Sequence, residues 1–237
     1  MPIRPFLAMT GAEIREKAGF PPKIAWMACH FSPYCLGLSN LPRELPPGSL
    51  LIVDDITPIH GHDPEIIAAQ LRERVETLGC RGVLLDFQRP DNAETAALAA
   101  ALTETLPCPV AVSDLYAGNR SHPVFLSPVP PSVPLAEHLA PWEGREVWLD
   151  ISPEGECITL TEDGAHIIPL PSPAPNMQGF ADDTLHCHYR IDMKKNAANF
   201  ILWRIREDLE HLMMEADNLG VAKMIGLYQE MKNYLPA

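Results

Sequence analysis

Apolar strands alternate with amphipathic helices in the first half of the chain, most clearly between residues 50 and 114. Leu50–Val53 is a continuous apolar run, which is typical of a strand buried on both faces. The next helix starts at Asp63, a capping residue, ends at Gly79, and repeats apolar residues at helical spacing: Ile67, Leu71, Val75 and Leu78. A strand over Gly82–Phe87, a helix from a capping Asp91 to Leu106 and a strand over Cys108–Ser113 continue the alternation. Strands joined by helical crossovers run parallel, so this pattern predicts either an open doubly wound sheet or a closed barrel.

The remaining chain has a looser pattern. Strands are predicted at Ile24–Cys29, Pro123–Leu126 and Glu146–Ile151. The sequence Glu162-Asp163-Gly164 between two short apolar runs indicates a β-hairpin over Cys157–Ile168. Further elements follow, namely strands over Leu185–Ile191 and Asn199–Trp203, a helix over Arg206–Leu219 and a strand over Val221–Leu227. Because no shift in composition divides the chain, we predict one domain over residues 1–237.

The strand at residues 82–87 resembles the motif strand of the family-18 glycoside hydrolases, the chitinase-like barrels. That family carries D-G-x-D-x-D-x-E on its fourth strand, and this chain reads R-G-V-L-L-D-F-Q from Arg81 to Gln88. Gly82 and Asp86 match the motif, and Phe87 supplies an aromatic residue. Arg81, Leu84 and Gln88 depart from it, and Gln88 replaces the catalytic acid.

The C-terminal part is similar to the same family in the order of its elements. His188-Tyr189, then Phe200–Trp203, the helix to Leu219 and the strand after Gly220 follow the order of small bacterial members. The resemblance implies an α/β fold, a (β/α) TIM-type barrel with a small β-hairpin insertion before the last strand. Only two strands are visible before the motif strand, where the family has three, so the sequence predicts a shortened barrel. The family's final-strand Trp near Lys223 and its Tyr near Leu126 are absent.

The resemblance assigns chemistry to the motif strand. Residues 84, 86 and 88 share one strand face, which is the interior of a barrel. In the family the final Glu protonates the glycosidic oxygen and the preceding Asp holds the substrate's acetamido group. An amide has no acidic proton to transfer, so Gln88 cannot serve as the general acid. Asp86 is the remaining catalytic candidate, with a structural role as a strand-end hydrogen-bonding group as the alternative.

Other residues are candidates for ligand binding because they stand at the ends of predicted strands or lie on long loops: Gln88, Asp54, Tyr34, Tyr228 and Glu230. Tyr189 is a further candidate because the resemblance places it on the Tyr-bearing strand of the family. For Asp54 and its neighbour Asp55, turn residues before Thr57-Pro58 are the competing interpretation. For Glu230, a solvated start to a terminal helix competes with a role at the rim.

Two histidine pairs and six cysteines are candidates for metal or redox chemistry. His60 and His62 lie in a loop, whereas His186 and His188 share a strand face, and hydrogen-bonded or solvated histidines are commoner than ligands. The cysteines show no CxxC pair. We therefore predict no metal and no cofactor, and reduced thiols in a cytoplasmic protein.

The net charge of −13 excludes binding to a nucleic-acid backbone, and no stretch is apolar enough to cross a membrane. Three functions stay open. The first is a glycosidase-like barrel that binds a carbohydrate or related small ligand without ordinary hydrolysis. The second is an active hydrolase using Asp86 with Glu230 or a metal, and the third is a non-catalytic protein-interaction barrel. The oligomeric state is not indicated by the sequence.

Overall fold

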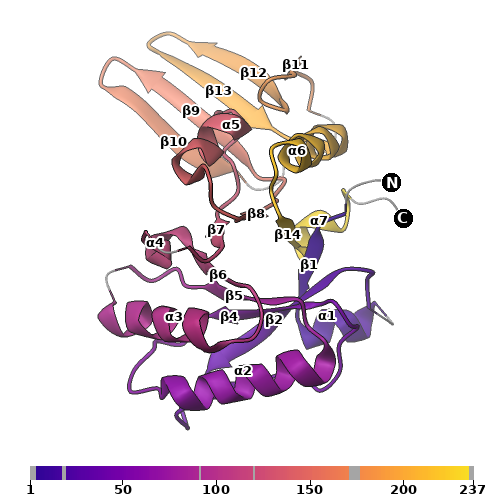
Figure 1. Cartoon of the computed structure of the whole chain (residues 1–237). Coiled ribbons are helices and arrows are strands. Elements are labelled where there is room, and N and C mark those ends of the chain that lie inside the picture. The colour runs from indigo at the N-terminus through magenta and orange to yellow at the C-terminus, as the bar shows by residue number, and fades with distance from the viewer. Residues whose placement is uncertain (1–3, 18–19, 91, 120, 171–176, 235–237) are drawn as a thin grey trace.

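Eight parallel strands form a closed ring (Figure 1). The computed structural model describes residues 4–17, 20–90, 92–119, 121–170 and 177–234. The ring consists of β1 (Phe6–Met9), β2 (Ile24–Phe31), β4 (Leu50–Asp54), β5 (Gly82–Asp86), β6 (Val110–Ser113), β7 (Val124–Leu126), β8 (Val147–Asp150) and β14 (Lys223–Leu227). It closes because β1 pairs with β2 on one side and with β14 on the other. The short β3 (Leu38–Ser39) pairs antiparallel with β2 outside the ring. The predicted TIM-type barrel is confirmed, and the open-sheet alternative is wrong.

The expectation of a shortened barrel is also wrong. Three strands of the ring precede β5, because Phe6–Met9 forms a first strand that the sequence pattern did not reveal. This strand has four residues, and all four are buried. A run so short carries neither alternation nor length as a signal, and its pairing with two neighbours stabilises it instead. The structure therefore places β5 fourth in the ring, as the motif resemblance implies.

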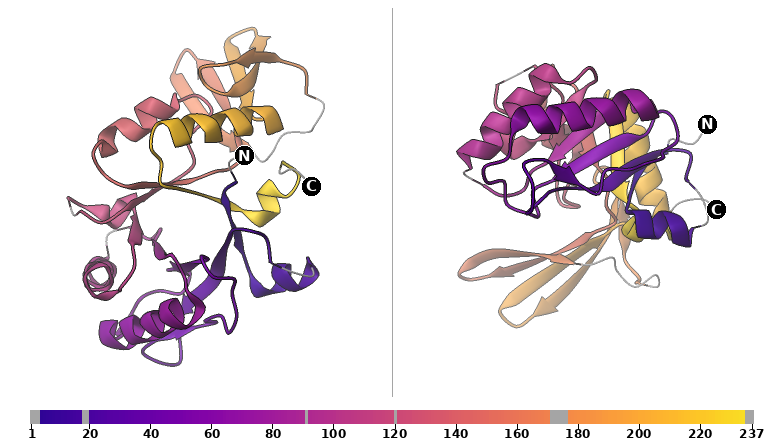
Figure 2. Two further views of the ribbon diagram at one scale, coloured as in Figure 1. Left: turned by 45° about the vertical axis from the view of Figure 1, so that its right-hand side comes forward. Right: turned by 90° about the horizontal axis from the view of Figure 1, so that it is seen from below.

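Helices pack around the ring (Figures 1 and 2). They are α1 (Gly11–Glu16), α2 (Pro64–Leu78), α3 (Ala93–Thr105), α4 (Asp114–Ala117), α5 (Leu135–Leu139), the 3-10 turn η1 (Ala140–Trp142), α6 (Arg206–Asn218) and α7 (Tyr228–Met231). Asp63 caps α2 by accepting a hydrogen bond from the Glu65 amide at 2.9 Å, and Gly79 ends the helix with φ of 65°. Asn92 caps α3, whereas the predicted cap Asp91 lies outside the described residues.

The part of the barrel interior toward the amino ends of the strands, called the lower layer below, is filled by apolar side chains. Along each strand these side chains alternate with outward-facing ones. These residues form one buried cluster: Phe6, Ala8, Ala25, Leu50, Ile52, Leu84, Ala111, Phe125, Trp148 and Ile225. The Trp148 ring is fully buried there. A Cβ atom at Gly82 would lie 2.7 Å from Cη2 of Trp148, so the glycine provides the space that this ring occupies.

A second sheet is inserted between β8 and α6 and projects from the barrel (Figures 1 and 2). Its antiparallel strands lie in the order β10 (Gly164–Leu170), β9 (Gly155–Thr161), β13 (Ala197–Trp203), β12 (Cys187–Lys194) and β11 (Phe180–Asp182). At its base the buried Arg204 donates a hydrogen bond to the Val129 carbonyl at 2.8 Å, and His188 pairs with Asp208 of α6 at 2.8 Å. The predicted hairpin is confirmed as β9 and β10, and three further strands extend it into a sheet.

Candidate functional site

Polar side chains replace apolar ones at the carboxyl ends of the barrel strands. Leu84 lies in the interior cluster, and Asp86 follows two residues later on the same face of β5. In the same way Asp150 follows Trp148 on β8, and Asp54 follows Ile52 on β4. The strand register places His30, Asp54 and Asp86 side by side on β2, β4 and β5. The mouth of the barrel is therefore lined by carboxylates and an imidazole.

His30 and Asp54 are hydrogen-bonded to each other within this layer. The His30 Nδ1 atom lies 2.7 Å from Oδ2 of Asp54, which is buried. The other Asp54 oxygen accepts a hydrogen bond from the Ile56 amide at 3.1 Å. The hydrogen bond to Ile56 fits the interpretation of Asp54 as a turn residue, and its role in ligand binding stays a prediction.

Asp86 and Gln88 are hydrogen-bonded to each other. The Gln88 side-chain amide donates to Oδ1 of Asp86 at 2.5 Å. Burial raises the pKa of Asp86, the Gln88 hydrogen bond opposes that shift, and the nearby carboxylates Asp54 and Asp55 add to it. An amide therefore contacts the carboxylate in the motif positions where the chitinase family has Asp and Glu.

Asp55 fixes the backbone that carries Gln88. Its two carboxylate oxygens accept hydrogen bonds from the amides of Gln88 and Arg89, each at 2.9 Å. The Arg89 side chain makes hydrogen bonds in the opposite direction. Its guanidinium donates to the backbone carbonyls of Asp55 at 2.8 Å and Ile56 at 2.7 Å. Asp55 is buried and acts as a structural link between the ends of β4 and β5.

Asp150, Ser152 and Glu230 form the opposite part of the mouth. The Ser152 hydroxyl donates to Glu230 at 2.9 Å. The pKa of Asp150 is raised to about 8, mainly by burial, and the negative charges of Asp86 and Glu230 contribute to that shift. At neutral pH Asp150 therefore keeps its proton, so this part of the mouth contains a hydrogen-bond donor among acceptors.

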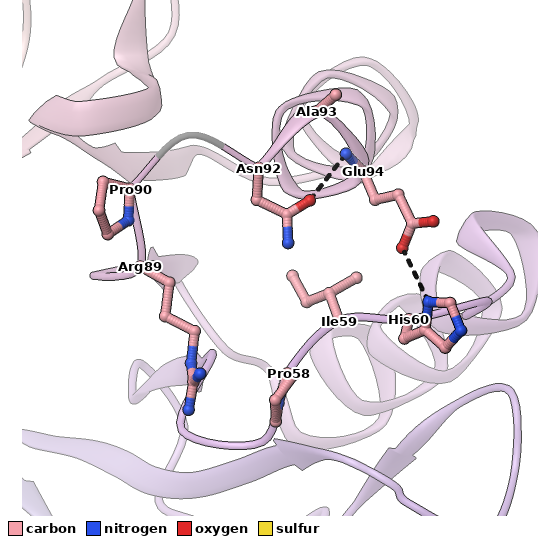
Figure 3. A pocket seen from close by; sticks show the side chains of 8 residues that line it. All are labelled: Pro58, Ile59, His60, Arg89, Pro90, Asn92, Ala93 and Glu94. Carbon is pink, nitrogen blue, oxygen red and sulfur yellow. Dashed lines mark hydrogen bonds and ion pairs between the residues drawn. The ribbon is translucent and has the colours of Figure 1, made fainter.

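An open hollow of about 630 Å³ lies beside the motif strand, between the loops that follow β4 and β5 (Figure 3). Arg89 and Asn92 border it on one side and His60 on the other. The Nδ1 atom of His60 lies 3.9 Å from Oε2 of Glu94. Because the loops after the strands form the binding surfaces of this fold, the hollow lies at the same end of the barrel as the mouth.

The predicted tyrosines are dispersed. Tyr34 lies on the loop after β2 with 95% of its surface exposed, and the Tyr228 ring packs against the Lys17 ammonium group at 5.3 Å. Tyr189 is on β12 of the inserted sheet, where its ring lies 5.7 Å from that of Phe180. Their ligand-binding roles stay predictions.

The histidine pairs have hydrogen-bonding partners. His62 contacts the Ser32 carbonyl at 3.0 Å, and His186 contacts Glu215 at 2.7 Å. Within residues 4–17, 20–90, 92–119, 121–170 and 177–234, no group of three or more His, Cys, Asp or Glu side chains is arranged to hold a metal ion. In that same part of the chain, no helix has the length and apolar character needed to cross a membrane.

Sequence reasoning missed His30, Asp150 and Ser152 as parts of the mouth. For Asp150 a signal existed, since an Asp directly after the apolar run Val147–Leu149 repeats the pattern of Asp54 and Asp86. For His30 the signal was hidden, because a register shift between Trp26 and Cys29 changes which residues of β2 face the interior.

Solved structures with a similar fold include two chitinases and a spore cortex-lytic enzyme. The class V chitinase from Nicotiana tobaccum in complex with NAG4 is 12% identical, with a TM-score of 0.54 over 86% of each chain. The GH18 chitinase from Cycas revoluta in complex with (GlcNAc)4 is 10% identical, with a TM-score of 0.54 over 94% of each chain. The spore cortex-lytic enzyme SleL of Bacillus cereus is 10% identical, with a TM-score of 0.53 over 86% of this chain and 63% of that chain.

The sequence comparisons give no match, either to a family of proteins or to a curated protein. The structural likeness shows that the chain has a chitinase-like, glycoside hydrolase-like barrel fold. At such low identity it shows the fold alone.

Proposed function

We propose that this barrel binds a carbohydrate at the carboxyl ends of its strands and does not hydrolyse it by the chitinase mechanism. The observation that carries the proposal is the hydrogen bond from the Gln88 amide to Asp86, at the end of the motif strand. General acid catalysis needs a proton that can be transferred, and an amide has none. Loss of a general acid typically lowers a rate by about 10²–10⁴-fold.

The polar lining of the mouth supports a hydroxyl-rich ligand. Asp54, Asp86 and Glu230 offer carboxylate acceptors, whereas Gln88 and the protonated Asp150 offer donors. Sugar hydroxyls donate and accept hydrogen bonds, so a mixed lining matches them better than a uniformly charged one. Two of the similar structures were solved with N-acetylglucosamine tetramers, which makes this tetramer the first ligand to test.

Binding is tested by calorimetry with (GlcNAc)4 on the wild type, Asp86→Ala and Asp217→Ala. Asp217 is an exposed carboxylate on α6, away from the mouth, and serves as the matched control. We expect Asp86→Ala to weaken binding at least about tenfold, because a buried hydrogen bond to a charged group contributes about 1.5–3 kcal/mol. The control should bind as the wild type does. Equal affinity in all three proteins would place the sugar elsewhere, and no binding by the wild type would contradict the proposal.

Hydrolysis is tested separately with an aryl chito-oligosaccharide. The wild type should show no turnover, and Gln88→Glu should restore activity only if the rest of the site permits it. Leu84 stands where the family has an Asp, so we expect at most a small gain. Wild-type turnover that disappears in Asp86→Asn would overturn the proposed loss of catalysis.

A second candidate is a hydrolase that uses Asp150 as its proton donor with Asp86 or Glu230 as the second carboxylate. It is favoured by one observation, the pKa of Asp150 at about 8, which keeps this carboxyl protonated at neutral pH. In that case the wild type would turn over the aryl substrate, Asp150→Asn would abolish turnover, and Gln88→Ala would retain it.

A further inference from the structure

One face of the inserted sheet is largely apolar. Its row nearest the barrel also carries Glu156, which accepts a hydrogen bond from the Ser132 amide at 3.0 Å. In an antiparallel sheet directly opposed residues point to the same face. The register places Ile167 opposite Ile158, Ile158 opposite Phe200, and Phe200 opposite Ile191. These residues form a row across β10, β9, β13 and β12. Neighbouring rows on the same face add Ala165, Leu160, Ala198, Met193, Tyr189 and Phe180. This set of ten residues is called the apolar face below.

Solvent reaches much of the apolar face. Ile167 is 58% exposed, Phe180 69% and Met193 77%. The strand β12 reads H-Y-R-I-D-M-K from His188 to Lys194, so polar and apolar residues alternate strictly. Such alternation is typical of an antiparallel sheet with one face packed and one face solvated. The sequence of the sheet thus fits a packed face, although its apolar side chains are exposed in the isolated chain.

Two hairpin tips of opposite charge lie at the same end of this sheet. The β9–β10 turn carries Glu162 and Asp163, and the β12–β13 turn carries Lys195, which follows Lys194 at the end of β12. Pairing of Thr161 with Ala197 places the two turns next to each other along the sheet edge. The acidic tip joins β9 to β10, and the basic tip joins β12 to β13. Because β9 and β13 are neighbours in the sheet, the boundary between these two strands separates the two tips.

We propose that the apolar face binds a second copy of this chain, with a two-fold axis parallel to the strands and between β9 and β13. Rotation about that axis keeps both tips at the same end and exchanges the two sides of the sheet. Each acidic tip then faces the basic tip of the partner. The same rotation places β10 over β12 and β9 over β13, so the apolar rows of the two copies meet. A closed two-fold dimer uses the same patch on both subunits, as this arrangement does.

The size of the face fits a reversible dimer. Strands about 4.8 Å apart, with a rise of about 3.3 Å per residue, give the sheet a flat footprint of roughly 500 Å². Projecting side chains raise the accessible area above that value, toward the roughly 800 Å² per partner of a standard interface. The patch is at the upper end of what monomers expose, about 300–600 Å². Charge at the tips adds specificity of orientation, and the apolar rows supply the affinity.

The matched pair Ile167 and Ile168 tests the proposal. The two neighbours are 58% and 57% exposed, but Ile168 pairs with Cys157 and points to the opposite face. Sedimentation velocity of the full chain, at concentrations up to about 100 µM to allow for a small interface, should show a dimer. Ile167→Glu should sediment as a monomer, whereas Ile168→Glu should remain dimeric. A wild-type monomer throughout, or equal loss of the dimer in both variants, would overturn the proposal.

A charge exchange tests the orientation of the two copies. Lys194→Glu with Lys195→Glu should weaken the dimer at least fivefold, since each acidic tip would then face another acidic tip. Adding Glu162→Lys and Asp163→Lys to that variant should restore it. Failure of the restoration would contradict the proposed axis. If (GlcNAc)4 binds the wild type but not Ile167→Glu, with no change in mass, the face is a sugar site and the dimer proposal is wrong.

Discussion

The two ends of the barrel interior are built from the same strands but have opposite chemistry. At the lower end Leu84 and Trp148 are fully enclosed by apolar neighbours. Two residues further along the same strands, Asp86 and Asp150 form a layer of carboxyl groups at the mouth. The strand period of two residues produces this change without any change in backbone. The lower layer thus provides stability, and the upper layer is available for ligand chemistry at some cost in stability.

Among variants that compare the two ends of the barrel interior, we expect Trp148→Ala to have the largest effect on the free energy of unfolding. Removing this buried ring leaves a cavity in the lower layer, which should reduce the free energy of unfolding by about 3–5 kcal/mol. Urea unfolding at pH 7 measures it. Trp142→Ala, at a partly exposed ring beneath Arg145, is the control and should cost much less. Equal losses would mean that the lower layer is not the stabilising part of the barrel.

This contrast also explains how much the sequence could predict. Leu50–Val53 and Gly82–Asp86 were recognisable because strands buried on both faces read as continuous apolar runs, and Asp63 and Gly79 marked the ends of α2 correctly. Phe6–Met9 was missed because four residues carry no period. His30 was missed because a register irregularity in β2 has no signature in the sequence.

The inserted sheet shows a different limit. Its hairpin turn was predicted from Glu162-Asp163-Gly164, yet the pairing of β9 with β13 joins residues about forty positions apart, and that pairing has no local signal. The contacts at the mouth have the same origin, since Asp55 meets Gln88 and Ser152 meets Glu230 only after the ring closes.

A smaller effect is expected for Asp55→Ala, which removes a support of the upper layer. Two partly buried backbone amides, of Gln88 and Arg89, would lose their acceptor. We expect the free energy of unfolding to fall by about 2 kcal/mol, because a buried donor left unsatisfied costs about 1–3 kcal/mol and water replaces part of the lost hydrogen bonding here. Asp63→Ala, which removes only a helix cap, should cost about 1 kcal/mol by the same urea assay. If the two losses are equal, Asp55 does not link the strand ends.

The last prediction concerns the pH dependence of the upper layer. The pKa of Asp150 is about 8 in the folded protein and near the ordinary aspartate value of 3.8 when the chain unfolds. Between these values the folded state keeps a proton that the unfolded state releases, so this group makes stability fall as pH rises from about 4 to 8. The slope from one such group is at most about 1.4 kcal/mol per pH unit.

Asp150→Asn keeps the shape of the side chain and removes the titration. Unfolding in urea at pH 5, 6, 7 and 8 should therefore give a flatter dependence for the variant, which gains on the wild type as pH increases. Asp86 also has a raised pKa, so a residual slope of the same sign should remain. Asp217→Asn on the outer helix α6 should reproduce the wild-type slope. Parallel slopes for the wild type and Asp150→Asn would show that Asp150 is ionised in the folded protein, and would remove the proton donor from this part of the mouth.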